Sequence, residues 1–179
     1  MMENVFVIIE GVLRSCCSEA EHIEIPEGVT KIGECAFSMC KNMQSVILPQ
    51  SLKIIDDFAF LFCDKLKSVE LPVNGKIIGK AAFKGCKALA DSDGFVVVNH
   101  TLYDYCGKDK MAWIPEGVNS IDYEAFYRNN HIRLVRIPEN VTMICDSAFD
   151  GCKNLVLLVA EGSYGEAYAK RKGISYIAR

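Results

Sequence analysis

A 23-residue unit recurs along this chain of 179 residues, and the repeat constrains the fold more than any other feature. The five prolines lie 23, 23, 43 and 23 residues apart, and a phenylalanine preceded by alanine stands eleven residues after each of them. Each unit has eight apolar positions, which a segment of that length cannot bury by itself. Stacked units would join these positions into one continuous core, so the repeat predicts a solenoid. The Ala-Phe pairs are Ala36-Phe37, Ala59-Phe60, Ala82-Phe83, Ala125-Phe126 and Ala148-Phe149.

Two kinds of local structure are expected within each unit. The residues before each proline alternate in character, as Ile23 and Ile25 do around Glu24, which predicts a short strand in a parallel sheet. Proline ends such a strand because it has no N–H for the next hydrogen bond. The alternation is absent around the Ala-Phe pair, and we expect a helical or 3₁₀ turn there. The expected fold is an α/β repeat solenoid, with a parallel β-sheet on one face and helical or 3₁₀ turns opposite.

The 43-residue interval contains an additional piece of 20 residues, and this piece has a twin at the N-terminus. A shift of 89 residues aligns residues 6–29 with residues 95–118 without a gap. In each twin an apolar run reaches a two-residue turn, Glu10-Gly11 or Asn99-His100, and then continues, which predicts a short hairpin. The chain therefore reads as a duplicated block whose second copy ends after two repeats.

The C-terminal segment departs from the repeat after Leu158. Ser163 and Glu166 form a capping-box pattern, and Gly173 is typical of the residue that follows a helix. We expect a terminal helix that covers the open core of the last repeat. As one domain, the chain divides into an N-terminal hairpin or cap (1–22), three repeats (23–91), a short insert coil (92–111), two repeats (112–158) and a C-terminal cap (159–179).

These elements together resemble the BspA-like leucine-rich repeat family. The resemblance rests on the unit I-P-x-x-V-x-x-I-x-x-x-A-F-x-x-C-x-x-L-x-x-V, on D-G-F followed by L-Y-D-Y-x-G, and on the ending G-S-Y followed by Y-A-x-x-x-G-I. It implies a right-handed leucine-rich-repeat superhelix, common in microbial surface or secreted proteins, that serves protein binding and adhesion rather than catalysis. The sequence departs from the family pattern at Asn129, where a cysteine is expected, and at Gly75, where a valine or leucine is expected.

Nine cysteines are present, and four of them, Cys40, Cys63, Cys86 and Cys152, recur with the repeat. An odd number prevents complete disulfide pairing, and the sequence contains no Cys-x-x-Cys, so we expect no structural metal. Because the four cysteines follow the packing period, we interpret them as small buried residues rather than redox groups. We expect these thiols to be free and slow to react, and an outlying thiol such as Cys16 to be alkylated first.

No sequence motif indicates catalysis or a cofactor. The three histidines, His22, His100 and His131, are not placed to activate a thiol, and no phosphate-binding loop, H-E-x-x-H or G-x-S-x-G pattern is present. We therefore expect no enzyme activity and no cofactor. Asn99 and Asn140 each begin a glycosylation sequon, which matters only in a secretory pathway that glycosylates.

The charge balance argues against two classes of partner. A net charge of −3 and a pI near 5.7 provide no basic surface for nucleic acid. The first apolar run, residues 5–9, is too short to span a membrane, and Glu3 precedes it where a secretory signal carries Lys or Arg. A complete chain of this kind would stay in the cytoplasm, and one that has lost a leader would be secreted or displayed on the cell surface.

The remaining candidate for function is the face of the expected sheet that points away from the core. Its outward positions, two residues before each proline or the equivalent, are Glu24, Ile47, Glu70, Trp113, Arg136 and Val159. Large apolar and aromatic side chains beside an arginine are typical of protein-binding hot spots. We select Ile47, Glu70, Trp113 and Arg136 as the candidate partner-binding surface. Alternatively, Trp113 only covers the irregular junction after the insert coil.

The leading functional hypothesis is a non-enzymatic module that presents its repeat sheet to a protein or peptide partner, in an adhesion-type role. The alternative is a structural repeat block of a larger surface protein that has no specific ligand of its own. The sequence does not distinguish the sheet face from the opposite face as the side that binds.

Overall fold

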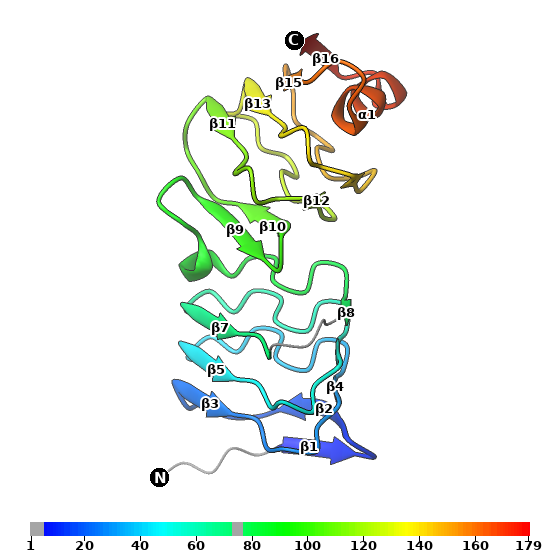
Figure 1. Cartoon of the computed structure of the whole chain (residues 1–179). Helices are drawn as coiled ribbons and strands as arrows, with labels where there is room; N and C mark the ends of the chain where they lie inside the picture. Colours follow the sequence, from blue (N-terminus) through cyan, green and yellow to red (C-terminus); the bar gives the residue numbers. More distant parts are fainter. Residues whose placement is uncertain (1–5, 73–76) are drawn as a thin grey trace. The chain divides into compact units, whose positions relative to one another are not determined.

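A computed structural model describes residues 6–72 and 77–179 of the chain (Figure 1). Gly75, where the family pattern is interrupted, lies outside these ranges. The contacts divide the chain into two compact units, an N-terminal unit (residues 1–89) and a C-terminal unit (residues 90–179). The border between the units coincides with the 89-residue shift that relates the two copies in the sequence.

The N-terminal unit contains two β-sheets (Figure 1). One sheet joins a hairpin to three two-residue strands in the order β1-β2-β4-β6-β8, and the other contains the strands that precede the prolines, in the order β3-β5-β7. The strands are β1 (Phe6–Ile9), β2 (Val12–Cys16), β3 (His22–Glu24), β4 (Lys31–Ile32), β5 (Ser45–Ile47), β6 (Ile54–Ile55), β7 (Ser68–Glu70) and β8 (Ile77–Ile78). A 3₁₀ turn, Lys87–Leu89, ends the unit.

The C-terminal unit repeats this plan and adds a helix. Its two sheets have the orders β14-β12-β10-β9 and β11-β13-β15-β16. The elements are β9 (Phe95–Val98), β10 (Thr101–Tyr105), β11 (Met111–Trp113), β12 (Ser120–Ile121), β13 (Leu134–Arg136), β14 (Met143–Ile144), β15 (Val156–Val159), α1 (Tyr164–Lys172) and β16 (Ser175–Ala178).

The strands before the prolines form the expected parallel sheets, and the register follows the repeat. In the N-terminal unit Ile23 pairs with Val46, and Val46 pairs with Val69, so each residue lies beside its equivalent 23 positions later. The equivalent pairing in the C-terminal unit joins Ala112 to Val135. Each unit is therefore a stretch of β-solenoid, as predicted. The second set of parallel strands, β4-β6-β8 and β12-β14, was not expected from the sequence.

Both predicted hairpins are present. Strands β1 and β2 pair antiparallel across Glu10 and Gly11, whose φ angles are 52° and 73°. Strands β9 and β10 pair in the same way across Asn99 and His100, whose φ angles are 48° and 62°. Two consecutive left-handed residues give the turn whose twist matches that of the flanking strands.

The segment around each Ala-Phe pair is a series of turns, and the helical or 3₁₀ turn expected there is not confirmed. The residue before the alanine is left-handed in four repeats, with φ angles of 56° at Cys35, 58° at Phe58, 51° at Ala81 and 55° at Glu124. A left-handed residue breaks the continuous right-handed backbone that a helix requires. These residues carry side chains, so no glycine marks the break in the sequence.

The hydrogen bonds of these turns connect each coil to the next. The N–H of Phe37 donates to the carbonyl of Ala59, and the N–H of Met39 donates to the carbonyl of Leu61, both at 2.8 Å. The N–H of Ser38, between them, closes a turn within its own coil. Alternate N–H groups therefore bond within their own coil and to the neighbouring coil. In this way the backbone N–H groups find hydrogen-bond acceptors without forming a helix.

A stack of aromatic rings forms the centre of each unit. In the N-terminal unit Phe60 lies between Phe37 and Phe83, with ring centroids 5.0 and 5.1 Å apart and all three side chains fully buried. In the C-terminal unit Phe126 and Phe149 stack at 4.8 Å. Two tyrosines outside the Ala-Phe pairs extend this second stack, with Tyr105 5.0 Å from Phe126 and Tyr168 6.0 Å from Phe149.

Helix α1 covers the last coil of the C-terminal unit, as expected. The Ser163 hydroxyl accepts the N–H of Glu166, and Gly173 ends the helix in a left-handed conformation with a φ angle of 65°. Tyr168 of the helix is buried and its hydroxyl donates to the carbonyl of Asp146. Strand β16, which the sequence did not predict, then pairs parallel with β15. Within the described residues, no helix combines the length and apolar character that crossing a bilayer requires.

Candidate interaction surface

The four sequence-predicted surface residues fall into two neighbouring pairs, one in each unit. Ile47 on β5 lies beside Glu70 on β7, and both side chains are exposed. Trp113 on β11 lies beside Arg136 on β13, where the indole is 52% exposed and the guanidinium side chain is partly buried. The structure thus brings the residues together within each unit, pair by pair.

The prediction for Val159 is wrong, because this side chain is buried in the core at 3% exposure. The residue that continues the row of Trp113 and Arg136 is Leu158, which pairs with Arg136 in the register of the sheet. The last coil has no proline from which to count, and the sequence position was therefore misassigned by one residue. A shift of one residue in a strand exchanges its two faces.

The outer face of the C-terminal sheet is mainly apolar. Because side chains alternate along a strand, the first and third residues of β11, β13, β15 and β16 share this face. The exposed fractions are 55% at Met111, 52% at Trp113 and 44% at Ile177, which places these apolar side chains in contact with solvent. We call the following six residues the apolar outer face: Met111, Trp113, Leu134, Val156, Leu158 and Ile177.

The corresponding face of the N-terminal sheet is polar, with Ile47 as its exposed large apolar residue. The His22 imidazole Nδ1 and the Ser45 hydroxyl lie at hydrogen-bond distance, 2.8 Å. The third positions of the strands hold Glu24 and Glu70 on either side of Ile47. The same backbone plan therefore carries a charged face in one copy and an apolar face in the other.

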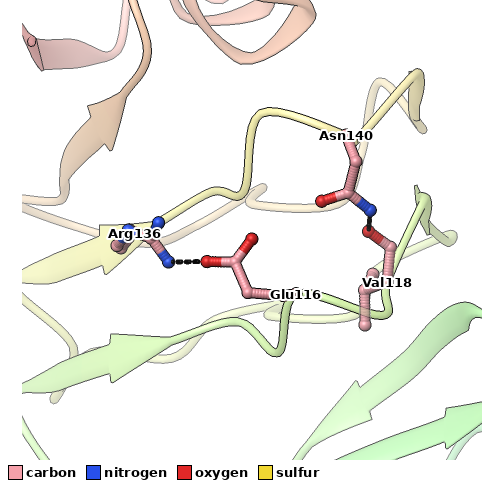
Figure 2. A network of polar contacts seen from close by, with 4 residues as sticks. All are labelled: Glu116, Val118, Arg136 and Asn140. Carbon is pink, nitrogen blue, oxygen red and sulfur yellow. Dashed lines mark hydrogen bonds and ion pairs between the residues drawn. The ribbon is translucent and has the colours of Figure 1, made fainter.

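Arg136, which lies between Trp113 and Leu158 in the sheet, forms an ion pair. Its guanidinium Nη1 donates to the Glu116 carboxylate (Figure 2), and of the two side chains Glu116 is the more exposed. Beside this pair, the Asn140 amide donates to the carbonyl of Val118 at 2.8 Å (Figure 2). One sequon asparagine therefore uses its side chain to connect two coils. Near Arg136, a hollow of about 360 Å³ is lined by residues that include Leu158 and Arg179.

The cysteines that follow the repeat are free thiols with a structural role. The Sγ atoms of Cys63, Cys86 and Cys152 each donate to the carbonyl of a phenylalanine in the preceding coil, at 2.9 to 3.0 Å. Burial raises the pKa of Cys40 to about 12, and the Cys86 thiol together with burial raises the pKa of Cys63. Such thiols stay protonated near neutral pH, which is the opposite of what a catalytic cysteine requires.

Cys16 is almost completely buried, at 9% exposure, but it remains more exposed than Cys63 and Cys86, which are fully buried. Its backbone N–H donates to the carbonyl of Ala36, as the N–H of Tyr105 donates to the carbonyl of Ala125 in the second copy. The most exposed thiols are Cys17 and Cys35. Cys16, Cys17 and Cys40 border a hollow of about 470 Å³. Across residues 6–72 and 77–179, no group of three or more His, Cys, Asp or Glu side chains is arranged to hold a metal ion.

Comparisons with known proteins identify the repeat. The family model described as "BspA type Leucine rich repeat region" matches in six copies over residues 8–93 and 92–156. No curated protein matches the sequence significantly.

Three solved structures that the chain resembles share 22% sequence identity with it. A Treponema pallidum leucine-rich repeat protein has a TM-score of 0.49 over 88% of this chain and 68% of its own. A leucine-rich cell surface protein of Faecalibacterium prausnitzii has a TM-score of 0.49 over 88% of this chain and 59% of its own. A leucine-rich repeat protein of Bacteroides ovatus has a TM-score of 0.43 over 89% of this chain and 48% of its own. Because the family model covers most of the described coils, the chain belongs to the BspA-type leucine-rich repeat family.

Proposed function

We propose that the chain is a non-enzymatic protein-binding module and that its partner docks on the apolar outer face. The observation that carries the proposal is the contrast between the two copies. Where the N-terminal sheet presents Glu24 and Glu70, the C-terminal sheet presents Trp113, Leu158 and Ile177. A polar face keeps a protein soluble, as on the N-terminal sheet. An exposed apolar face on the equivalent sheet therefore indicates a binding surface.

The composition of the face supports a protein or peptide as the partner. Tryptophan is the residue most enriched among binding hot spots, and Trp113 stands on a rigid sheet with half of its surface already exposed. A scaffold of stacked coils loses little conformational freedom on binding, which favours affinity. The net charge of −3 supports protein over nucleic acid. Adhesion to a host or neighbouring surface is the form of binding that the family resemblance implies.

The test compares equivalent substitutions on the two sheets. A partner captured with the wild-type chain is purified, and its affinity is measured for Trp113→Ala, for Leu158→Ala and for Ile47→Ala as the matched variant of the N-terminal sheet. We expect Trp113→Ala to weaken binding by about 2 kcal/mol, roughly 30-fold, with an unchanged melting temperature. We expect a smaller loss for Leu158→Ala and none for Ile47→Ala. Equal affinities for all three variants would contradict the proposal.

One observation favours the alternative, a structural block without its own ligand. Trp113 lines the same pocket as Phe95 and Tyr105 of the insert coil, so the indole stands at the junction that follows this coil. If that is its role, Trp113→Ala lowers the melting temperature and leaves the affinity per folded molecule unchanged. Measuring both quantities on the same preparation distinguishes the two functions.

A further inference from the structure

A pocket of about 310 Å³ opens beside Trp113, at one margin of the apolar outer face. It lies entirely within the C-terminal unit, between strand β11 and the coil that contains the β9–β10 hairpin. Its lining includes three aromatic residues, Phe95, Tyr105 and Trp113, and three charged residues, Asp93, Asp109 and Lys110. Aromatic rings and carboxylates together are the groups that recognise an organic cation.

The aromatic part of the pocket is held rigidly. Phe95 and Tyr105 pack at 5.0 Å between ring centroids and are 2% and 7% exposed, so they form a fixed base. A Cβ atom on Gly107 would collide with the Tyr105 hydroxyl, which shows how closely the backbone packs on this ring. Trp113, at 52% exposure, is the ring with a free face. A planar group that enters the pocket would stack on it.

The charged part of the pocket is negative overall. Asp93 and Asp109 are exposed carboxylates, and Lys110 supplies one opposing charge. Asp91 adds a third carboxylate nearby, but it accepts the N–H groups of Asp93 and Phe95 at 3.0 and 2.9 Å. Burial, Asp109 and then Asp93 raise the pKa of Tyr105, which is consistent with both carboxylates lying near the phenol.

The repeat itself does not require this pocket. The 89-residue shift places Cys16, Ala20 and Glu24 at the positions of Tyr105, Asp109 and Trp113. Phe95 corresponds to Phe6, so the first copy folds as the same hairpin and strand with one of the three rings, but without the rings of Tyr105 and Trp113 and without the Asp109 carboxylate. The Trp113 ring and the Asp109 carboxylate are found in the second copy alone, and both residues are exposed outside the aromatic stack, which points to a use rather than to packing.

We propose that this pocket receives an arginine side chain of a polypeptide partner, with the guanidinium between the Trp113 ring and the carboxylates of Asp93 and Asp109. Arginine fits better than lysine because its planar group stacks on an aromatic ring while its N–H fork donates to carboxylates. A neutral side chain would lack the charge-assisted hydrogen bonds that a guanidinium makes with the two carboxylates. This inference names the partner chemistry of the proposed binding module and rests on that function.

The test uses the fact that Trp113 is the only tryptophan of the chain. The full chain is titrated with N-acetyl-arginine methylamide while the NMR signal of the indole N–H is followed. The lysine amide is the second probe, and the citrulline amide is the neutral control of nearly identical shape. We expect a saturable shift with arginine, weaker binding of lysine and no saturable shift with citrulline. Equal shifts with arginine and citrulline would overturn the proposal.

Charge variants then locate the interaction. The double variant Asp93→Asn with Asp109→Asn should weaken arginine binding about tenfold, because it removes both carboxylate partners. Asp150→Asn with Glu161→Gln removes the same net charge from exposed positions outside the pocket and should leave the affinity unchanged. Lys110→Gln should strengthen binding about twofold. An unchanged affinity in the first variant, or weaker binding in the Lys110 variant, would contradict the proposal.

The two proposals fail in different experiments. If the amide probe does not bind but Leu158→Ala lowers the affinity for the purified partner, the module binds protein without using the arginine site. If the probe binds but neither Trp113→Ala nor Leu158→Ala changes the affinity for the partner, the pocket binds arginine and the apolar outer face is not the docking surface.

Discussion

At the scale of single residues, the cysteines show what a repeat pattern does and does not reveal. Their period predicts buried side chains: Cys63 and Cys86 are fully buried, whereas Cys40 and Cys152 are only partly buried. The sequence does not reveal that each thiol meets a phenylalanine carbonyl of the preceding coil, because that contact depends on the backbone direction in the turn. At Asn129, which replaces a cysteine, the side-chain oxygen instead accepts the N–H groups of His131 and Ile132 at 3.1 Å.

The order of thiol alkylation follows from this burial. In the native protein we expect Cys17 and Cys35 to react first, and Cys63 and Cys86 last. Raising the pH should accelerate the labelling of Cys40, because its pKa of about 12 keeps it protonated at neutral pH and the thiolate is the reactive form. Mass spectrometry after brief alkylation at several pH values measures the order. Early labelling of Cys63 would show that the coils open readily.

Phe60 is the most stringent test of the aromatic stack. It is fully buried between two parallel rings in the N-terminal unit, so Phe60→Ala leaves a cavity that neighbouring coils cannot fill. We expect a loss of about 3–5 kcal/mol in the free energy of unfolding. Chemical denaturation measures this, with Phe62→Ala, an exposed phenylalanine of the same coil, as the control. A midpoint equal to that of the wild type would contradict the assignment of Phe60 to the core.

At the scale of elements, the sequence predicts those structures whose signals are local. The proline-terminated strands, the hairpin at Asn99 and His100 and the helix after Ser163 each follow from a few adjacent residues. Strands such as β4 are two residues long and leave no periodic pattern to detect. The pocket beside Trp113 is assembled from a hairpin, a loop and a strand, so the sequence predicts its exposed indole but not its other walls.

Capping of helix α1 provides a test at this scale. The Ser163 hydroxyl accepts the N–H of Glu166, and the Glu166 carboxylate accepts the N–H of Gly162 at 2.8 Å. Ser163→Ala removes the first of these bonds and should destabilise the protein by about 1 kcal/mol. Ser163→Asp, which restores an acceptor at the cap, should recover most of this loss. Thermal unfolding of both variants measures the difference, and equal melting temperatures would show that the helix does not need its cap.

At the scale of the whole molecule, the two units have self-contained sheets. Every strand pairing in the described residues joins strands of the same unit, and the aromatic stack from Phe95 to Tyr168 lies within the second unit. We therefore expect residues 90–179, expressed alone, to fold with the native β11-β13-β15-β16 sheet. Circular dichroism and the NMR signal of the Trp113 indole, compared with those of the full chain, test this expectation. A disordered spectrum would show that the second unit depends on the first.

The hydrogen bonds between coils also bear on how such a chain changes in evolution. The bonds from Phe37 to Ala59, from Phe60 to Ala82 and from Phe126 to Ala148 span 22 residues each, so neighbouring repeats within a unit are connected by the same main-chain contact. Recombination that deletes or inserts one whole coil would leave each remaining junction with an equivalent partner. The architecture therefore sets a spacing but no fixed number of coils, and the length of the protein can drift while its surface residues diverge.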